Sequence, residues 1–318
     1  MKLKYLYICL LFVAGLSACE KEQDENLSDF DVKTDATVYK VGEKVTFNLT
    51  GNPLQITFYS GEPGRIHEYR SGRVLGVEKL FGSFATNVAY GSQPDLLSVW
   101  VSSNFNGKYT IEDIKAATWK NNVSKNFKLA PHSMSSTSAS LAVSSGVLDL
   151  TGETEPGKPL YFAFRYKKKP DAEAGTQRNW LIRNILIEGS TILGDTPLAN
   201  GNNFNLVYDE NFHPDSTADR TSGISSSGVI TLRAPSLPNP IGAKNIEVWA
   251  VSKAINTSEV NVGSDLAEPI KGYSNVPIHK HEYVYNTPGT YRVTFVASNK
   301  TAEENEEVVK HIDIKIVD

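Results

Sequence analysis

The stretch HEYVYNTPGTYRVTFVASNK, residues 281–300, decides the fold class of this chain of 318 residues. Its second half alternates apolar and polar side chains, and the apolar positions are Tyr291, Val293, Phe295 and Ala297. A period of two is the pattern of a half-buried β-strand. The pair Pro288-Gly289 predicts a turn before it, because proline fixes its φ and glycine accepts a positive φ.

The same period of two recurs at both ends of the chain, in KVTFNLTG (residues 44–51) and HIDIKIV (residues 311–317). LYFAFRYK (residues 160–167) and WLIRNILIEG (residues 180–189) are also rich in β-forming residues and are bounded by turn residues. Many short strands separated by turns are typical of β-sandwiches. The one modest helical candidate is residues 111–117, which follow a possible cap at Thr110. The sequence therefore predicts an all-β protein.

The beginning of the chain has the features of an export signal. Lys2 and Lys4 precede an apolar run of about a dozen residues, whereas a bilayer-spanning helix needs roughly 20. This pattern predicts a signal peptide over residues 1–18. The sequence LSAC, residues 16–19, resembles the bacterial lipobox, which implies that Cys19 is acylated and becomes the new N-terminus. The alternative is an ordinary signal peptide with a chance cysteine at that position.

Residues 19–27 form a polar, acidic segment after this cysteine, which we expect to be a solvated tether. The segment resembles the signal with which Bacteroides-type bacteria send lipoproteins to the outer face of the outer membrane. No later segment is long and apolar enough to span a bilayer, so the lipid is the only membrane contact that we infer. Removing Lys2 and Lys4 changes the formal charge from −4 to −6, which argues against nucleic acid as a partner.

Residues 30–64 resemble the first half of a PKD-type, immunoglobulin-like domain, with a turn at residues 40–43 and an aromatic-Ser-Gly-Glu sequence at residues 59–62. The second half of that signature, a tyrosine followed by Pro-Gly-Thr-Tyr and a strand ending in asparagine, lies in residues 281–300. We therefore expect one sandwich split between residues 28–75 and 263–318. A domain insertion of this kind is tolerated where the chain ends of the host lie close together.

Residues 96–127, 145–167 and 179–189 resemble the jelly-roll module of cleaved-adhesin type, which is related to galactose-binding-like domains. Asn104 and Thr151 depart from that pattern, in which the family carries aspartate and serine. Residues 247–258 also resemble one of its strands, with departures at Lys253 and Asn256. We expect this jelly-roll to occupy residues 76–262. A simple row of three sandwiches is the alternative.

Taken together, the order of these segments resembles a family of uncharacterised Bacteroides-type outer-membrane lipoproteins. Members are encoded among glycan-utilisation systems of the starch-utilisation type. The resemblance implies a non-catalytic capture protein that binds glycan at the cell exterior. Its implied partners are an outer-membrane transporter or neighbouring capture lipoproteins. An adhesive or structural lipoprotein that contacts a protein partner is the rival interpretation.

Catalytic patterns are sparse. His279 and His281 have the spacing of two metal ligands on one side of a strand, but nothing nearby completes a coordination shell, which favours two histidines on an exposed strand edge. No Gly-x-Ser-x-Gly sequence supports a serine hydrolase. The acidic pairs Glu112-Asp113 and Glu153/Glu155 are candidate glycosidase carboxylates, but solvated surface charge is the more ordinary interpretation. The sequence therefore predicts no enzyme.

Glycan recognition is better represented, because sugars stack on tryptophan or tyrosine while asparagine and aspartate take their hydroxyl groups. Alternation along its strand leaves Trp100 either outward-facing or core. Trp119 lies at a loop edge, but it also matches a position of the module, which favours a core role. Trp180 and Trp249 fall at core positions of the module. The candidate glycan-binding residues are Trp100, Trp119, Asn121, Asn122, Tyr208 and Asp209.

The long polar loop at residues 208–223 is a second candidate for function, since such loops often carry binding residues. Asp215-Ser216-Thr217 within it also resembles an O-glycosylation site of Bacteroides-type secreted proteins. No cofactor is expected, apart from a structural Ca²⁺ that oxygen-rich residues 104–107 and 208–211 could hold.

Overall fold

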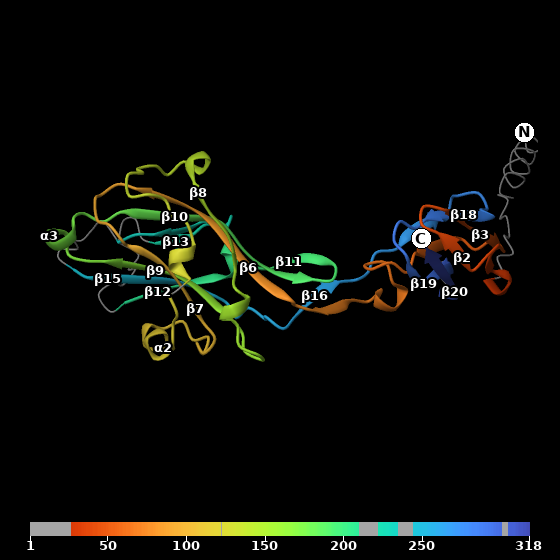
Figure 1. Ribbon diagram of the computed structural model, residues 1–318, viewed down its shortest axis with the longest axis horizontal. Coiled ribbons are helices and arrows are strands. Elements are labelled where there is room, and N and C mark those ends of the chain that lie inside the picture. Colours follow the sequence, from red (N-terminus) through yellow and green to blue (C-terminus); the bar gives the residue numbers. More distant parts are fainter. Residues whose placement is uncertain (1–26, 122, 210–221, 235–243, 301–304) are drawn as a thin grey trace, which may run out of the picture. The chain divides into compact units, whose positions relative to one another are not determined.

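The computed structural model describes residues 27–121, 123–209, 222–234, 244–300 and 305–318 (Figure 1). The chain divides into two compact units. The terminal unit combines the chain up to Ser71 with Ser264–Asp318, and the inserted unit is Gly72–Gly263. Nearly all regular structure in the described residues is β-strand, which confirms the all-β prediction. The lipobox and Cys19, Asn122, and residues 215–217 lie outside the described residues.

The terminal unit is a sandwich of two sheets. One sheet has the order β1 (Asp31–Thr34), β3 (Lys44–Thr50) and β18 (Lys280–Val284). The other has the order β17 (Glu268–Lys271), β4 (Gln55–Tyr59), β19 (Gly289–Lys300), β20 (Asn305–Val317) and β2 (Val38–Lys40). The alternating apolar residues of β3 and β19 meet in one core, in which Phe47, Phe58 and Phe295 are in ring contact.

Each half of the terminal unit supplies strands that lie between strands of the other half. β4 lies between β17 and β19, and β19 and β20 in turn lie between β4 and β2. In the other sheet, β3 pairs with β1 on one side and with β18 on the other. Side chains reinforce this pairing: the Tyr285 hydroxyl donates to the Ser60 carbonyl at 2.8 Å, and the Leu54 amide donates to Asn299 Oδ1 at 2.9 Å. Neither half has a complete sheet without the other.

The inserted unit is also a sandwich. Its larger sheet has the order β13 (Gly223–Ile224), β14 (Ile230–Leu232), β10 (Asn179–Thr191), β6 (Lys79–Ala89) and β8 (Val143–Asp149), with β11 (Gly194–Asn200) paired to β10. Its smaller sheet has the order β12 (Phe204–Tyr208), β15 (Ile246–Ser252), β9 (Tyr161–Lys168) and β7 (Leu97–Ser102). The strand pairings described in these two sheets are antiparallel.

A two-stranded ribbon, β5 (Arg73–Gly76) and β16 (Glu259–Gly263), brings the two ends of the inserted unit together. Arg73 is paired with Gly263 in its register. The chain thus leaves and re-enters the terminal unit at adjacent points, which is the geometry that a domain insertion requires. In the structure the unit boundaries lie after Ser71 and after Gly263. The sequence predicts them at residues 75/76 and 262/263.

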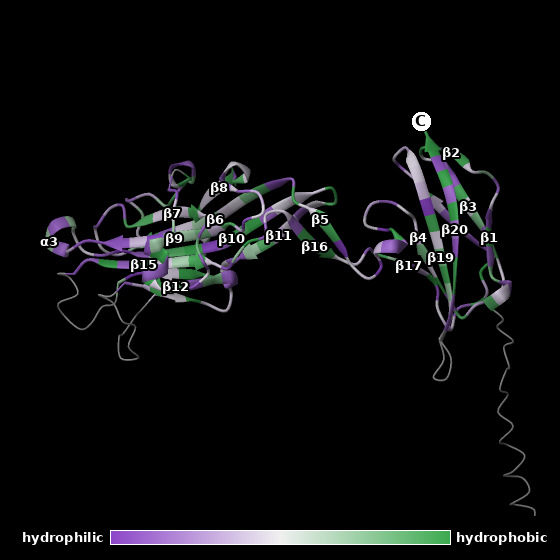
Figure 2. Ribbon diagram, turned by 90° about the horizontal axis from the view of Figure 1, so that it is seen from below, coloured by the Kyte–Doolittle hydropathy of each residue, from purple (hydrophilic) through white to green (hydrophobic). Residues whose placement is uncertain are grey.

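Two short α-helices lie in the described residues, α2 (Ile111–Ala116) and α3 (Asp171–Ala174). The expected helix is confirmed as α2, and its cap is Thr110, whose hydroxyl accepts from the Asp113 amide at 3.2 Å. Figure 2 shows the hydrophobic residues gathered on the strands, while α3 is mainly hydrophilic. None of the helices in the described part of the chain has the length and apolar character needed to cross a membrane.

Candidate functional site

The smaller sheet of the inserted unit has two different faces. One face packs on the main core, with Val99, Phe164 and Val248 fully buried. On the other face, which we call the outer face, the pairing registers set Ser98, Arg165, Trp249 and Val207 in one row across the four strands. A neighbouring row holds Trp100, Ala163, Val251 and Asn205, and the row on the other side holds Lys167, Glu247 and Asp209.

The segment that contains α2 covers part of the outer face. Ile111 and Ile114 of α2 are buried in a second apolar cluster with Trp249. Trp119, at the end of this segment, contacts Trp249 with ring centroids 5.2 Å apart, and its indole donates to the Ile114 carbonyl at 3.0 Å. The Trp100 ring also contacts Trp249, with ring centroids 5.7 Å apart. Three tryptophans that are distant in sequence therefore form one cluster, of which Trp100 and Trp119 are half-buried.

A paired arginine lies against these rings. The Arg165 guanidinium carbon is 5.4 Å from the Trp100 ring centroid and 5.3 Å from that of Trp249, which is the range of a cation–π interaction. Arg165 also donates two hydrogen bonds to Glu247, of 2.9 and 2.8 Å. The Trp249 indole donates to the same carboxylate at 2.6 Å. Both members of the pair remain about a fifth exposed, so the cluster faces solvent with polar atoms.

The electrostatics of this cluster favour an ionised carboxylate. Burial alone acts to raise the pKa of Glu247. The hydrogen bonds from Arg165 and Trp249, together with the positive charges of Arg165 and Lys167, outweigh burial and hold the pKa below its usual range. Glu247 therefore carries a charge near neutral pH. Its oxygens can accept hydrogen bonds from a ligand but cannot donate a proton.

The structure brings together most of the candidate residues but separates one of them. Lys120 bridges to Val101, and this antiparallel register sets the exposed Asn121 beside Trp100. Asp209 lies next to Glu247, whose backbone amide donates to the Asp209 carboxylate at 2.9 Å. Tyr208 points to the opposite face, where it packs on the main core and donates to the Ser222 carbonyl at 3.2 Å. The alternation of β12 requires this, because neighbouring residues face opposite sides of a strand.

The expected core tryptophans are buried. Trp180 lies in the main core with 7% of its surface exposed, and Trp249 keeps 4%. The parity of β7 directs Val99 and Val101 to the main core and therefore turns Trp100 to the outer face.

The remaining chemical candidates have local structural roles. His279 is exposed, but His281 turns inward, which corrects the expectation of two exposed histidines; its ring contacts Phe47 and Phe58. Hydrogen bonds from Thr110 and Asn106 lower the pKa of Asp113, and the hydrogen bond from Lys158 lowers that of Glu155. A glycosidase acid needs the opposite shift.

Of the two segments expected to hold calcium, residues 104–107 are internally bonded, and residues 210 and 211 of the other lie outside the described residues. The Asn104 side-chain oxygen accepts from the Thr118 amide at 2.8 Å, and the Asn106 side-chain oxygen accepts from the Lys108 amide at 2.9 Å. Within the described ranges no group of three or more histidine, cysteine or acidic residues is arranged to hold a metal ion.

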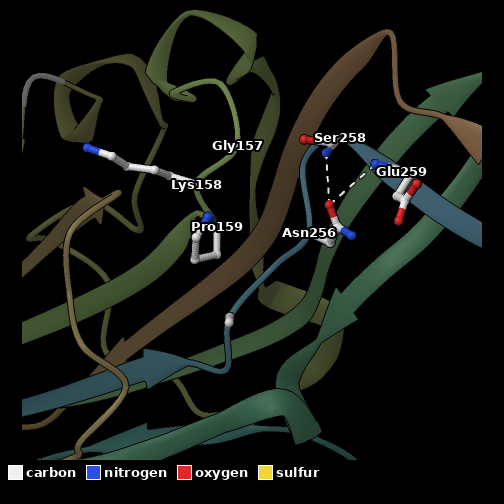
Figure 3. A pocket seen from close by; sticks show the side chains of 7 residues that line it. Gly157, Lys158, Pro159, Asn256, Ser258 and Glu259 are labelled. Carbon is white, nitrogen blue, oxygen red and sulfur yellow. Dashed lines mark hydrogen bonds between the residues drawn. The ribbon is translucent and has the colours of Figure 1, made fainter.

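A pocket of about 380 Å³ lies elsewhere in the inserted unit, between residues 157–159 and residues 254–259 (Figure 3). Figure 3 shows Asn256, Ser258 and Glu259 on one wall, where the Asn256 side chain accepts from the Ser258 amide at 3.0 Å. Lys158 and Pro159 come from the opposite wall. No aromatic residue lines this pocket, so it lacks the stacking surface that the outer face has.

The sequence pattern does not single out Arg165 and Glu247, although both lie in segments that resemble strands. One signal was available: Arg165 is a charged residue inside a strand whose other members are mostly apolar. Its partner could not be found in the same way, because the pairing depends on the register between β9 and β15.

Comparison with known proteins gives one family. The model of a domain of unknown function (DUF5017) matches residues 18–208, which is more than half of the chain. The match includes the N-terminal half of the terminal unit and a large part of the inserted unit. No curated protein and no solved structure matches this chain. The chain therefore belongs to the DUF5017 family, whose function is unknown.

Proposed function

We propose that this protein is a cell-surface lipoprotein that binds glycan on the outer face of the inserted unit, without catalysis. The observation that carries the proposal is the meeting of half-buried Trp100 and Trp119 with the charged pair Arg165–Glu247. Aromatic rings offer an amphipathic surface for the C–H face of a sugar, and fixed polar groups beside them give orientation and specificity. Asp209 and Asn121 add oxygen and amide groups at the edges.

The proposal also covers where the protein lies in the cell. The lipobox and acidic tether support an anchor at Cys19 in the outer membrane, with the sandwiches displayed outside the cell. The resemblance to Bacteroides-type proteins of glycan-utilisation loci supports capture beside a transporter or another lipoprotein. Changing Cys19 to Ala should release the protein from the membrane fraction. Continued membrane association of that variant would overturn the anchoring part of the proposal.

The binding part is tested by retention of the purified protein in gels that contain different polysaccharides. We expect one class of glycan to retard the wild-type protein and the variant Trp100→Ala to lose that retardation. Tyr273→Ala is the matched control, because Tyr273 is 70% exposed and lies in the terminal unit. Retardation that Trp100→Ala leaves unchanged would exclude the outer face as the binding surface.

One observation favours the alternative, an adhesive lipoprotein that contacts a protein partner. Leu266, Tyr273 and Val276 are 68%, 70% and 77% exposed and lie in one short part of the terminal unit. Exposed apolar residues of this size mark protein contacts more often than sugar contacts when they form one patch. Crosslinking in intact cells separates the two functions. A protein partner captured by wild type and lost in a Tyr273→Ala variant, with no glycan retention, would favour the adhesive role.

A further inference from the structure

A groove of about 520 Å³ lies in the terminal unit, on the face of its five-stranded sheet that is turned away from the core. β19 and β20 contribute Thr290, Arg292 and Asp313 to it. These residues alternate along their strands with Tyr291 and Ile314, which lie in the core. Clefts that bind small molecules have volumes of about 300–1,000 Å³. The rest of the lining comes from the connection between β4 and β5, through Gly61, Ile66, Glu68 and Tyr69.

The buried side chain of His67 holds this connection on the sheet. His67 is 6% exposed, and the centroid of its ring lies 5.2 Å from that of Tyr59 and 5.9 Å from that of His311. Tyr59 belongs to β4 and His311 to β20, so the histidine packs on the same sheet that carries the groove. The next two residues, Glu68 and Tyr69, are exposed and line the groove. The anchored histidine therefore fixes the place of both neighbours.

Two further contacts fix the connection. Gly61 has φ +81°, and a Cβ at this position would come within 2.6 Å of the Arg292 carbonyl oxygen. A glycine is needed for the chain to lie directly on β19 there. Further along, the Ile66 amide donates to the Asp265 carboxylate at 2.9 Å. Because these contacts exist without a ligand, the groove is formed in advance, which lowers the entropic cost of binding.

The polar groups of the groove can both donate and accept hydrogen bonds. Arg292 donates two to Asp313, at 2.9 and 3.2 Å, which leaves three of the five N–H donors of a guanidinium. Both side chains are 57% exposed, so a ligand can reach their remaining donor and acceptor positions. The hydrogen bond and charge of Asp313 raise the pKa of Arg292, and the charge of Glu68 raises it further. Glu68 therefore lies close enough to add a second carboxylate to the pair.

An aromatic ring accompanies these charges. Tyr69 keeps 39% of its surface exposed and lines the groove together with the half-buried Ile66. The outer face of the inserted unit also combines aromatic rings with a paired arginine, but the charge of the groove is its own. One guanidinium and two carboxylates give its lining a formal net charge of −1.

We propose that this groove is a second glycan-binding site and that it binds a neutral sugar residue. A sugar hydroxyl donates one hydrogen bond and accepts another, so it can bind a carboxylate with its proton and a guanidinium with its oxygen. The Tyr69 ring offers a surface for the C–H groups of the same sugar. The excess of negative charge disfavours uronic acids and sulfated sugars. The choice of a glycan rests on the proposed function of the chain, whereas the preference for a neutral sugar follows from the groove.

The test is ligand-observed NMR on the purified full chain that carries Trp100→Ala, in which the outer face is impaired. The probes are the methyl glycosides of glucose, galactose, mannose and xylose, with methyl glucuronide as the anionic probe. We expect at least one neutral glycoside to bind at millimolar concentration and the glucuronide not to bind. Adding Tyr69→Ala should weaken the binding about ten-fold, because the stacking surface is lost.

Tyr273→Ala, in the same background, is the matched control. Tyr273 is another exposed tyrosine of the terminal unit that does not line the groove, so its loss should leave glycoside binding unchanged. Glu68→Lys tests the charge without touching the ring, and Glu68 is exposed, so the variant should fold. It changes the formal charge of the lining from −1 to +1 and should admit the glucuronide. A glucuronide that already binds as well as the neutral glycosides before this change would overturn the proposed preference.

The outcomes for the groove and for the outer face are distinguishable. If no neutral glycoside binds to the chain with Trp100→Ala, or if binding is unchanged by both Tyr69→Ala and Glu68→Lys, this inference is wrong, whatever the polysaccharide gels show. If glycosides bind and Tyr69→Ala weakens them while no polysaccharide retards the wild-type protein, the groove stands and the outer-face proposal fails.

Discussion

Arg165 on β9 and Glu247 on β15 are diagonal neighbours joined by two hydrogen bonds, with N–O distances of 2.9 and 2.8 Å. The planar guanidinium matches the geometry of the carboxylate, and its faces remain free to lie against Trp100 and Trp249. One side chain thus fixes the carboxylate and both rings. The outer face owes its arrangement to this pair as much as to the tryptophans.

Replacing Arg165 by Lys should therefore destabilise the inserted unit. Lysine keeps the charge but loses the second hydrogen bond and the planar contact with the rings. Hydrogen bonds to charged groups contribute about 1.5–3 kcal/mol when buried, and the partial exposure of this pair reduces the figure to about 1–2 kcal/mol. Denaturant unfolding followed by tryptophan fluorescence measures the loss.

Arg292→Lys is the control for that experiment. Arg292 makes the same two-bond contact with Asp313, at 2.9 and 3.2 Å, but both side chains are 57% exposed. Exposed pairs of this kind contribute at most about 1 kcal/mol. An Arg165→Lys variant no less stable than Arg292→Lys would mean that the rings and the carboxylate hold their positions without the guanidinium.

Glu247 should make the inserted unit sensitive to acid. Its pKa in the folded protein lies below the ordinary value, so its contribution to stability is complete above the unfolded pKa of about 4.3 and is lost as pH falls through the folded pKa. Glu247→Gln cannot ionise. The difference in melting temperature between wild type and Glu247→Gln should thus shrink steadily once the pH is lowered below about 4. A difference that stays constant down to the acid limit would contradict the shift.

His281 predicts a pH dependence in the terminal unit, at a higher pH. Burial lowers its pKa, although Glu268 and Glu282 act to raise it, and its Nε2 is buried without a partner. The folded unit therefore prefers the neutral ring, and stability should decline as pH falls below the ordinary histidine pKa of about 6.5. His281→Phe should remove part of this decline, since phenylalanine fits the contacts with Phe47 and Phe58 without ionising.

Unfolding curves between neutral pH and about pH 5 measure that effect, a range that brackets the ordinary histidine pKa. His67 keeps some of the dependence in the variant, because burial also lowers its pKa. His279→Phe is the control, as His279 is exposed. If both variants retain the full wild-type slope, the ring of His281 is not desolvated in solution.

The sequence predicts the parts of this site better than their combination. Alternation along β7 places Trp100 on the face opposite to that of Val99 and Val101, and a cap signal at Thr110 predicts the start of α2. These are local features, governed by a few adjacent residues. The pair Arg165–Glu247 depends on a strand register and on a contact across 82 residues. No local pattern determines such a register, so this pair emerges only from the fold.

For His281, the local sequence favours the wrong environment. Its place beside an exposed residue at 279 favours an exposed strand edge, yet β18 alternates, and its half-buried positions include His281 and Tyr283. The partner strand β3 supplies Phe47 opposite His281. A histidine ring can fill an apolar position when it stays neutral, and the residue type alone does not reveal which role it takes.

The two ends of the chain together build the terminal unit. The Asp265 amide donates to the Tyr69 carbonyl at 3.1 Å, and the Leu266 amide donates to the Gly64 carbonyl at 2.8 Å, so the two chain segments lie side by side where the inserted unit begins and ends. Replacing residues 72–263 by a short Gly-Ser linker should leave a chain that folds cooperatively, because every strand of the terminal unit keeps its partners.

The contrasting variant ends at Ser71. It retains β1 to β4 but loses β18, β17 and β19, which are the neighbours of β3 and β4, so it should remain unfolded. Circular dichroism and the dispersion of amide NMR signals compare the two chains. A folded fragment ending at Ser71, or an unfolded linker variant, would show that the two ends do not build one sandwich. The split follows from the register: Lys280–Val284 complete the sheet that Lys44–Thr50 begin, and neither end of the chain can bury Phe47 alone.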